Sequence, residues 1–185
     1  MTTERRIGEI CEFLRTHVCG DIELKKPNDD AANEVVWVNP SVCGVYVPRA
    51  PGEDGWLSPT PCVIVAPIRD TRQRDGGVLT IRLLAMTWDP GTREERGAGN
   101  VTDMALEIDR EGWRGLYAFM ERIQAALAAH ATIGDMEIGY PMEASLFGDG
   151  ENVPDLRPYY LGMIDLPMRY ASVPRRNQIR RDLME

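Results

Sequence analysis

Residues 113–127 carry the pattern that most constrains the fold. Their apolar side chains stand at offsets of 0, 3, 4, 7, 10 and 14 from Trp113, which places them on one face of an α-helix. We expect Asp109 as the N-cap of this helix and His130 near its C-terminal end. Such a face must be buried against another layer, and segments with strand patterns lie on both sides of it in the sequence.

Two strands are predicted before this helix. Residues 62–68 (CVIVAPI) form a continuous apolar run, which is typical of a strand covered on both faces. A polar connection joins them to residues 78–88 (VLTIRLLAMTW), so we expect a β-hairpin with a long tip. Residues 89–100 (DPGTREERGAGN) are rich in charge and glycine and are predicted to be a mobile loop.

Two further strands are predicted after the helix. In residues 136–147 and 160–171 the apolar side chains fall on the even positions, so each strand buries one face. Both segments carry a proline on the outward phase, Pro141 and Pro167. Because proline has no N–H to donate, we expect an unpaired edge or a bulge near each proline.

The N-terminal third adds a helix and an insertion. Residues 3–18 have apolar side chains on one helical face. Prolines break residues 25–61 into short pieces, of which 35–38 and 42–47 are predicted to pair as a small hairpin.

The order of elements is therefore helix, insertion, hairpin, long helix, hairpin. It predicts a single α+β domain over residues 1–174, with a central, mostly antiparallel sheet and flanking helices. Residues 175–185 are predicted to be a basic C-terminal tail.

Charge is distributed unevenly along the chain. Five arginines and no acid lie between Leu166 and Arg181, namely Arg169, Arg175, Arg176, Arg180 and Arg181. Taking these five positive charges from a net charge of −8 leaves −13 for the rest of the chain. Such a body lacks the excess of basic residues that binds nucleic acid or an anionic membrane, so we expect neither partner. The tail either pairs with the acidic body of another copy or is a solvated terminus.

The chain offers few groups for catalysis. It has two histidines, His17 and His130, and any Ser-His or Cys-His arrangement must use one of them. The acids of the loop 149–155 lack the regular ligand spacing of a calcium loop, and no glycine-rich phosphate motif follows a strand. We expect no catalytic residue, no metal and no cofactor. The four cysteines are unclustered, and with no apolar leader at the start we expect reduced thiols in an intracellular protein.

Two segments resemble the tail-completion (terminator) proteins of long-tailed bacteriophages. In residues 88–130 a strand ends in Trp-Asp-Pro, a charged loop follows, and Glu-Gly-Trp-Arg opens a helix containing Met-Glu-Arg-Ile. The later run RPYYLGMIDLPMRYASVP is an aromatic-led strand that ends in Val-Pro. The resemblance rests on texture and element order, and it covers roughly residues 60–174. The family has no invariant catalytic motif to transfer.

The resemblance implies a non-enzymatic α+β subunit that assembles as a ring, commonly a hexamer, in the host cytoplasm and then in the virion tail. Such a ring caps the tail tube, fixes its length and offers the head-tail joining surface. Its implied partners are other copies of itself, the tail-tube protein and the head-tail connector or neck protein. The insertion at 25–61 departs from the minimal family pattern, so a neighbouring neck protein is an alternative.

The charged segments supply the candidate subunit-interface residues. These are Arg93, Glu94, Glu95 and Arg96 in the loop, with Arg175, Arg176, Arg180 and Arg181 in the tail. Two alternatives remain open at this point: a small hydrolase or transferase that uses acids of the loop 149–155, and a bacterial adaptor domain.

Overall fold

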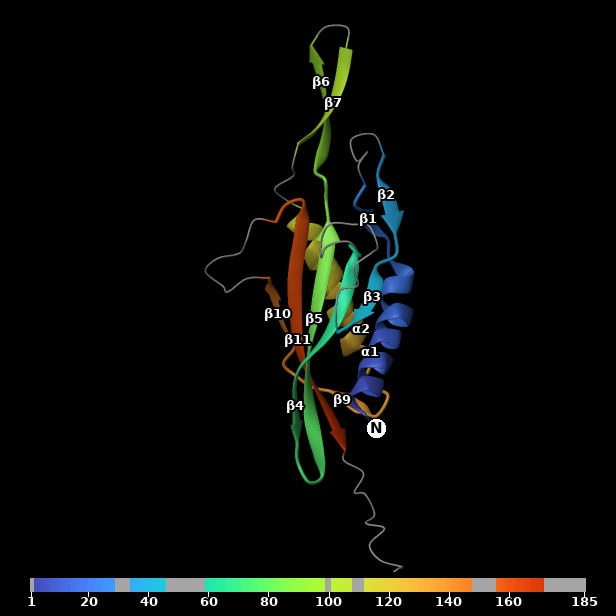
Figure 1. The fold of residues 1–185 in the computed structure, drawn as a ribbon, viewed down its shortest axis with the longest axis vertical. Helices are drawn as coiled ribbons and strands as arrows, with labels where there is room; N and C mark the ends of the chain where they lie inside the picture. Colours follow the sequence, from blue (N-terminus) through green and yellow to red (C-terminus); the bar gives the residue numbers. More distant parts are fainter. Residues whose placement is uncertain are drawn as a thin grey trace, which may run out of the picture.

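The computed structural model describes residues 2–28, 34–45, 59–98, 101–107, 112–147 and 156–171. Its centre is a curled, mixed sheet whose main strands run in the order β3-β4-β5-β11-β9-β8, with β10 also paired to β11 (Figure 1). All pairings are antiparallel except that of β3 with β4. The strands are β3 (Ser41–Gly44), β4 (Cys62–Arg72), β5 (Gly76–Trp88), β8 (Thr132–Ile133), β9 (Met136–Ile138), β10 (Glu143–Leu146) and β11 (Tyr159–Ala171). The predicted α+β class is confirmed.

Both long helices cover the same face of this sheet. Helix α1 (Thr3–His17) packs toward β3 and β4, and α2 (Trp113–Ala128) packs toward β5 and β11 (Figure 1). Between sheet and helices lies the main core, in which alternate residues of the long strands, such as Leu83 and Ile164, are fully buried. A Cβ at Gly162 would collide with the side chain of Met120, so glycine in β11 permits the close approach of α2.

The opposite face of the sheet is apolar at one end and polar further along. Cys62, Ile64, Met86 and Leu161 are buried together there, in a smaller cluster. Further along the same strands, Arg82 and Asp165 stand opposite each other and form a two-pronged ion pair with N···O distances of 2.8 and 2.7 Å. Cover on both faces, which the sequence predicts for residues 62–68, is confirmed for residues 62–65 only, because Ala66 and Pro67 are partly exposed and Ile68 is half exposed.

Strand β4 contains a bulge at Ile68. Pro67 lies opposite Ile81 and Arg69 opposite Thr80, so Ile68 has no partner and is half exposed. The extra residue reverses the alternation, and Asp70 consequently lies opposite Leu79, on the face that the helices cover.

The predicted strand 136–147 is wrong as a single element. It is two short strands, β9 and β10, that pair in succession with the same edge of β11. The interruption contains Pro141, where the sequence predicts a bulge or an unpaired edge, and it lies beside Pro167 of β11. The predicted strands 62–68, 78–88 and 160–171 are confirmed, the first two being longer and their tip shorter than expected.

The predicted hairpin inside residues 25–61 is also wrong. Strand β2 (Val36–Val38) pairs with β1 (Leu24–Lys26), and β3 joins the central sheet parallel to β4. Local β propensity identified β2 and β3, but it did not identify β1 and carries no information on pairing partners.

Helix α2 differs from its prediction at its beginning. It has Gly112 at the N-cap position, without a side-chain cap, whereas Asp109 lies outside the described residues. Trp113 belongs to the predicted apolar face yet is 42% exposed, while Phe119, which the spacing omits, is buried.

Candidate assembly surface

The predicted loop 89–100 is instead the first half of a β-hairpin. Strand β6 (Thr92–Ala98) pairs antiparallel with β7 (Val101–Glu107) in a sheet of their own among the described strands. This hairpin, which we call the arm, projects beyond the end of the central sheet (Figure 1). An isolated two-stranded hairpin is marginally stable in water, so the arm is a segment that gains from contact with another surface.

The arm contains the four interface candidates of the loop. Arg93, Glu94, Glu95 and Arg96 all belong to β6, and the register sets them opposite Leu106, Ala105, Met104 and Asp103 of β7. The remaining candidates, Arg175, Arg176, Arg180 and Arg181, lie outside the described residues.

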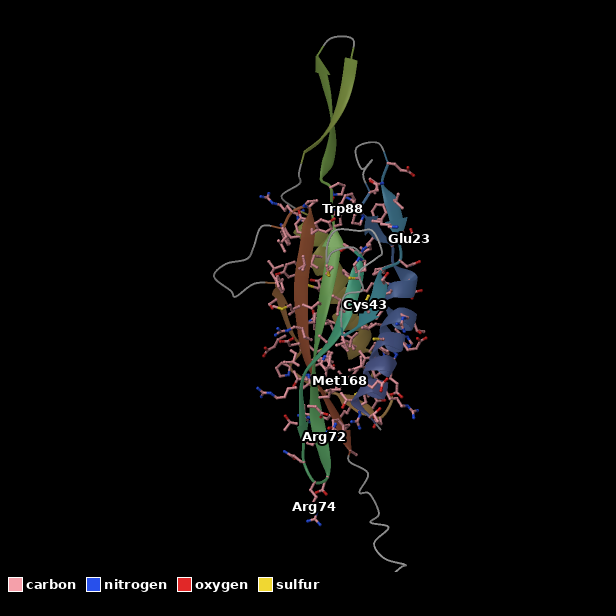
Figure 2. All side chains as sticks on the ribbon, in the orientation of Figure 1. Glu23, Cys43, Arg72, Arg74, Trp88 and Met168 are labelled. Atoms are coloured by element: carbon pink, nitrogen blue, oxygen red, sulfur yellow. The ribbon has the colours of Figure 1, made fainter. Side chains whose placement is uncertain are left out.

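The root of the arm is fixed to the body by Asp89. Its backbone N–H donates to the carbonyl of Pro158, and its carboxylate accepts from the Lys25 Nζ at 2.7 Å. The same carboxylate accepts the N–H of Gly91 at 3.1 Å, closing a turn in which Gly91 has φ 92°. That left-handed conformation favours glycine. The Trp-Asp-Pro-Gly sequence therefore sets the direction in which the arm leaves β5 after Trp88 (Figure 2).

A cavity of about 580 Å³ opens between α2 and the β10–β11 edge of the sheet. Helix α2 contributes Trp113 and Tyr117, whose rings meet edge to face at 5.7 Å, and Phe147 follows β10. Leu156 and Tyr160 also line the cavity, whose walls are mainly aromatic and aliphatic, with Arg157 as the charged exception. Trp113 and Phe147 are 42% and 37% exposed, so this cavity presents large apolar side chains to the outside.

A polar cluster ties the other end of the sheet together. The carboxylate of Asp70 accepts hydrogen bonds from the hydroxyl groups of Tyr170 at 2.5 Å and Thr3 at 3.0 Å, and from Arg72. The bond from Arg72, assisted by the other donors, lowers the pKa of Asp70. Burial and the bond to Asp70 raise the pKa of Tyr170.

Arg6 extends this cluster toward the turn between β8 and β9. Its guanidinium binds both carboxylate oxygens of Asp135, at 3.1 and 2.9 Å, and stacks on the ring of Tyr170 with its central carbon 3.5 Å from the ring centre. The bond from Arg6 lowers the pKa of Asp135. These contacts join the start of α1, the end of β11 and the β8–β9 turn, which is a structural role.

The two histidines meet although they are far apart in the sequence. The rings of His17 and His130 have centroids 4.7 Å apart, with Phe13 packed against both. The Nδ1 of His130 donates to the carbonyl of Ala126 at 2.8 Å, beside the end of α2, where the sequence predicts this histidine. Within the described parts of the chain, no three His, Cys, Asp or Glu side chains gather at a site that could hold a metal ion.

The thiols are free and mostly buried, as the sequence predicts. Burial raises the pKa of the Cys19 thiol to about 11 and that of Cys62 to about 12. A thiol so far from ionisation is a poor nucleophile.

The loop 149–155, which carries the enzymatic alternative, lies outside the described residues. Across the described helices, none is long and apolar enough to cross a membrane.

No protein-family model matches the sequence of this chain, and no curated protein matches it either.

The cavity and the arm root were missed by sequence reasoning, because both depend on segments that meet only in the fold. The arm itself had a local signal, the Gly-Ala-Gly-Asn run at 97–100, which is turn chemistry between two segments of similar length.

Proposed function

We propose that this protein is a non-enzymatic structural protein of a long-tailed bacteriophage. In this proposal it assembles as a ring, caps the tail tube and provides the surface to which the head is joined. Its partners are other copies of itself, the tail-tube protein and the head-tail connector or neck protein. It acts first in the host cytoplasm and then in the virion tail.

The observation that carries the proposal is the arm. A two-stranded hairpin that pairs with no other described strand is poorly stabilised by its own chain. Its position beyond the end of the sheet suits a contact with a neighbouring molecule (Figure 1). Strand β6 carries the run Arg-Glu-Glu-Arg, which suits an interface specified by charge complementarity.

Light scattering after gel filtration tests the proposal, both for the protein alone and after mixing with purified tail tubes. We expect a ring or a tube-bound assembly, and we expect Arg93→Glu combined with Arg96→Glu to weaken it. Arg74→Glu is the matched control, because Arg74 lies at the opposite end of the molecule (Figure 2). A wild-type chain that remains a monomer and also fails to bind tail tubes would contradict the proposal.

The basic tail provides a second test. Truncation after Val173 removes four of the five clustered arginines and should weaken the ring. In the full chain, the fraction of assembled protein should fall as the salt concentration rises above about 0.15 M, because salt screens exposed ion pairs. Equal assembly of the truncated chain would assign these arginines to a solvated terminus.

A further inference from the structure

The fold brings together the only two histidines of the sequence. His17 is the last residue of α1, and His130 lies two residues after the end of α2. The centres of their rings are 4.7 Å apart, and the ring planes are inclined by 54°. Both rings pack on Phe13, which is buried, whereas His17 is exposed and His130 is half-buried. Solvent therefore reaches a pair of imidazoles that rests on a packed support.

The spacing of the two rings fits a shared metal ion. An ion about 2.1 Å from a ring nitrogen lies about 3.2 Å from the ring centre, so two imidazoles on one tetrahedral ion have centres about 5 Å apart. The observed separation of 4.7 Å is close to this value. Two imidazoles at such a spacing bind an ion with little movement of either helix.

The hydrogen bond of His130 leaves one of its nitrogens available as a ligand. A carbonyl oxygen can only accept, so Nδ1 carries the proton in its 2.8 Å bond to Ala126. In the neutral ring, Nε2 then has the lone pair that binds a metal. Histidines that bind metals usually donate their other ring N–H to a carbonyl or carboxylate, which fixes the orientation and tautomer of the ring. His130 has this support already.

The surroundings of the pair favour a cation over an anion. Each helix has the negative end of its dipole at its C-terminus, where His17 and His130 lie. Imidazole nitrogens suit Zn²⁺, Cu²⁺ and Ni²⁺, whereas Mg²⁺ and Ca²⁺ prefer oxygen ligands. The chemistry of the pair therefore selects a divalent transition metal.

We infer that His17 and His130 form a binding site for a divalent transition-metal ion such as Zn²⁺, which holds the ends of α1 and α2 together. Water completes the coordination, since the described part of the chain gathers no third His, Cys, Asp or Glu at the pair. The site requires only one copy of the chain, so it is independent of the proposed ring.

Calorimetric titration of ZnCl₂ into the reduced full chain tests the site. We expect one Zn²⁺ per chain and a rise in the unfolding temperature when Zn²⁺ is added. His17→Phe and His130→Phe each keep a ring against Phe13 while removing a nitrogen ligand, and each should lower the affinity about 10-fold or more. Cys43→Ser is the matched control, because it removes a partly exposed thiol that also suits zinc, and its affinity should equal that of the wild type.

A second measurement does not depend on the folding of the variants. In NMR spectra of the wild-type chain, the ring signals of both histidines should shift together and saturate at one equivalent of Zn²⁺, and Mg²⁺ should leave them unchanged. Absence of Zn²⁺ binding, or equal binding by the wild type and both Phe variants, would overturn the inference. Zinc binding that leaves both ring signals in place would also overturn it, because the ion would then be bound elsewhere. None of these outcomes alters the proposed function, which the assembly assays test separately.

Discussion

The ion pair between Arg6 and Asp135 makes a quantitative prediction, because its two partners differ in exposure. The side chain of Arg6 is 5% exposed and that of Asp135 is 37% exposed. Asp135→Ala leaves a buried guanidinium without its carboxylate, and loss of one member of a buried pair costs about 3–5 kcal/mol. The ring of Tyr170 still receives the cation, so we place the cost near the lower limit, at about 3 kcal/mol.

Removal of Arg6 should lower the free energy of unfolding by less than removal of Asp135. Arg6→Met keeps an apolar side chain of similar length, and the Asp135 carboxylate that remains is accessible to water. We therefore expect a loss of about 1 kcal/mol. In the double variant no charge is buried, so it should be about 2 kcal/mol more stable than Asp135→Ala alone.

The assay is the free energy of unfolding from urea titrations followed by circular dichroism. Arg5→Met is the matched control on the same helix, because Arg5 is 73% exposed and its ion pair with Glu9 should contribute under about 0.5 kcal/mol. The reasoning is refuted if Arg6→Met is the more destabilising single change. It is equally refuted if the double variant is less stable than Asp135→Ala.

Further predictions concern pH, two glycines and a thiol. Hydrogen bonds lower the pKa values of Asp70 and Asp135, so both carboxylates stabilise the fold above the pKa of an unfolded aspartate, which is about 4. The free energy of unfolding should therefore fall as the pH drops below about 4, and Asn at both positions should flatten this dependence. Gly8→Ala should raise the unfolding free energy by up to about 1 kcal/mol, since a Cβ in this exposed turn of α1 meets nothing within 4 Å. Gly77→Ala should lower it by about 2 kcal/mol, because the new Cβ would lie 2.7 Å from a backbone oxygen of the facing strand. Iodoacetamide at pH 8 should modify Cys62 only after unfolding, as mass spectrometry would report; rapid labelling of the native protein would contradict its burial.

Hydrophobic periodicity predicted the elements whose apolar faces pack into the main core. The helices α1 and α2 and the strands β4, β5 and β11 each repeat an apolar side chain toward the core, and such repetition is readable in the sequence. Residues 89–100, which include the first strand of the arm, were predicted as a loop because that strand belongs to a separate two-stranded sheet, where burial in the central core imposes no alternation. Pairing partners were beyond local reasoning for a related reason. Strand β3 joins β4 across the insertion, and nothing in four residues specifies that partner.

The interruption beside Pro167 preserves the predicted alternation of faces in β9 and β10, although Tyr140, which was predicted on the buried face, lies in the interruption and is 59% exposed. The carbonyl of Pro167 accepts from the N–H of Gly139 at 2.7 Å, so the N–H that proline lacks would have faced the same edge. Beyond this point the register moves by two residues, from Ile138 opposite Met168 to Glu143 opposite Asp165. Because side chains alternate with a period of two, a shift of two residues preserves their faces. The even positions of β10 therefore keep the orientation predicted for an unbroken strand, and the same shift sets which residues at the end of β10 reach the rim of the cavity.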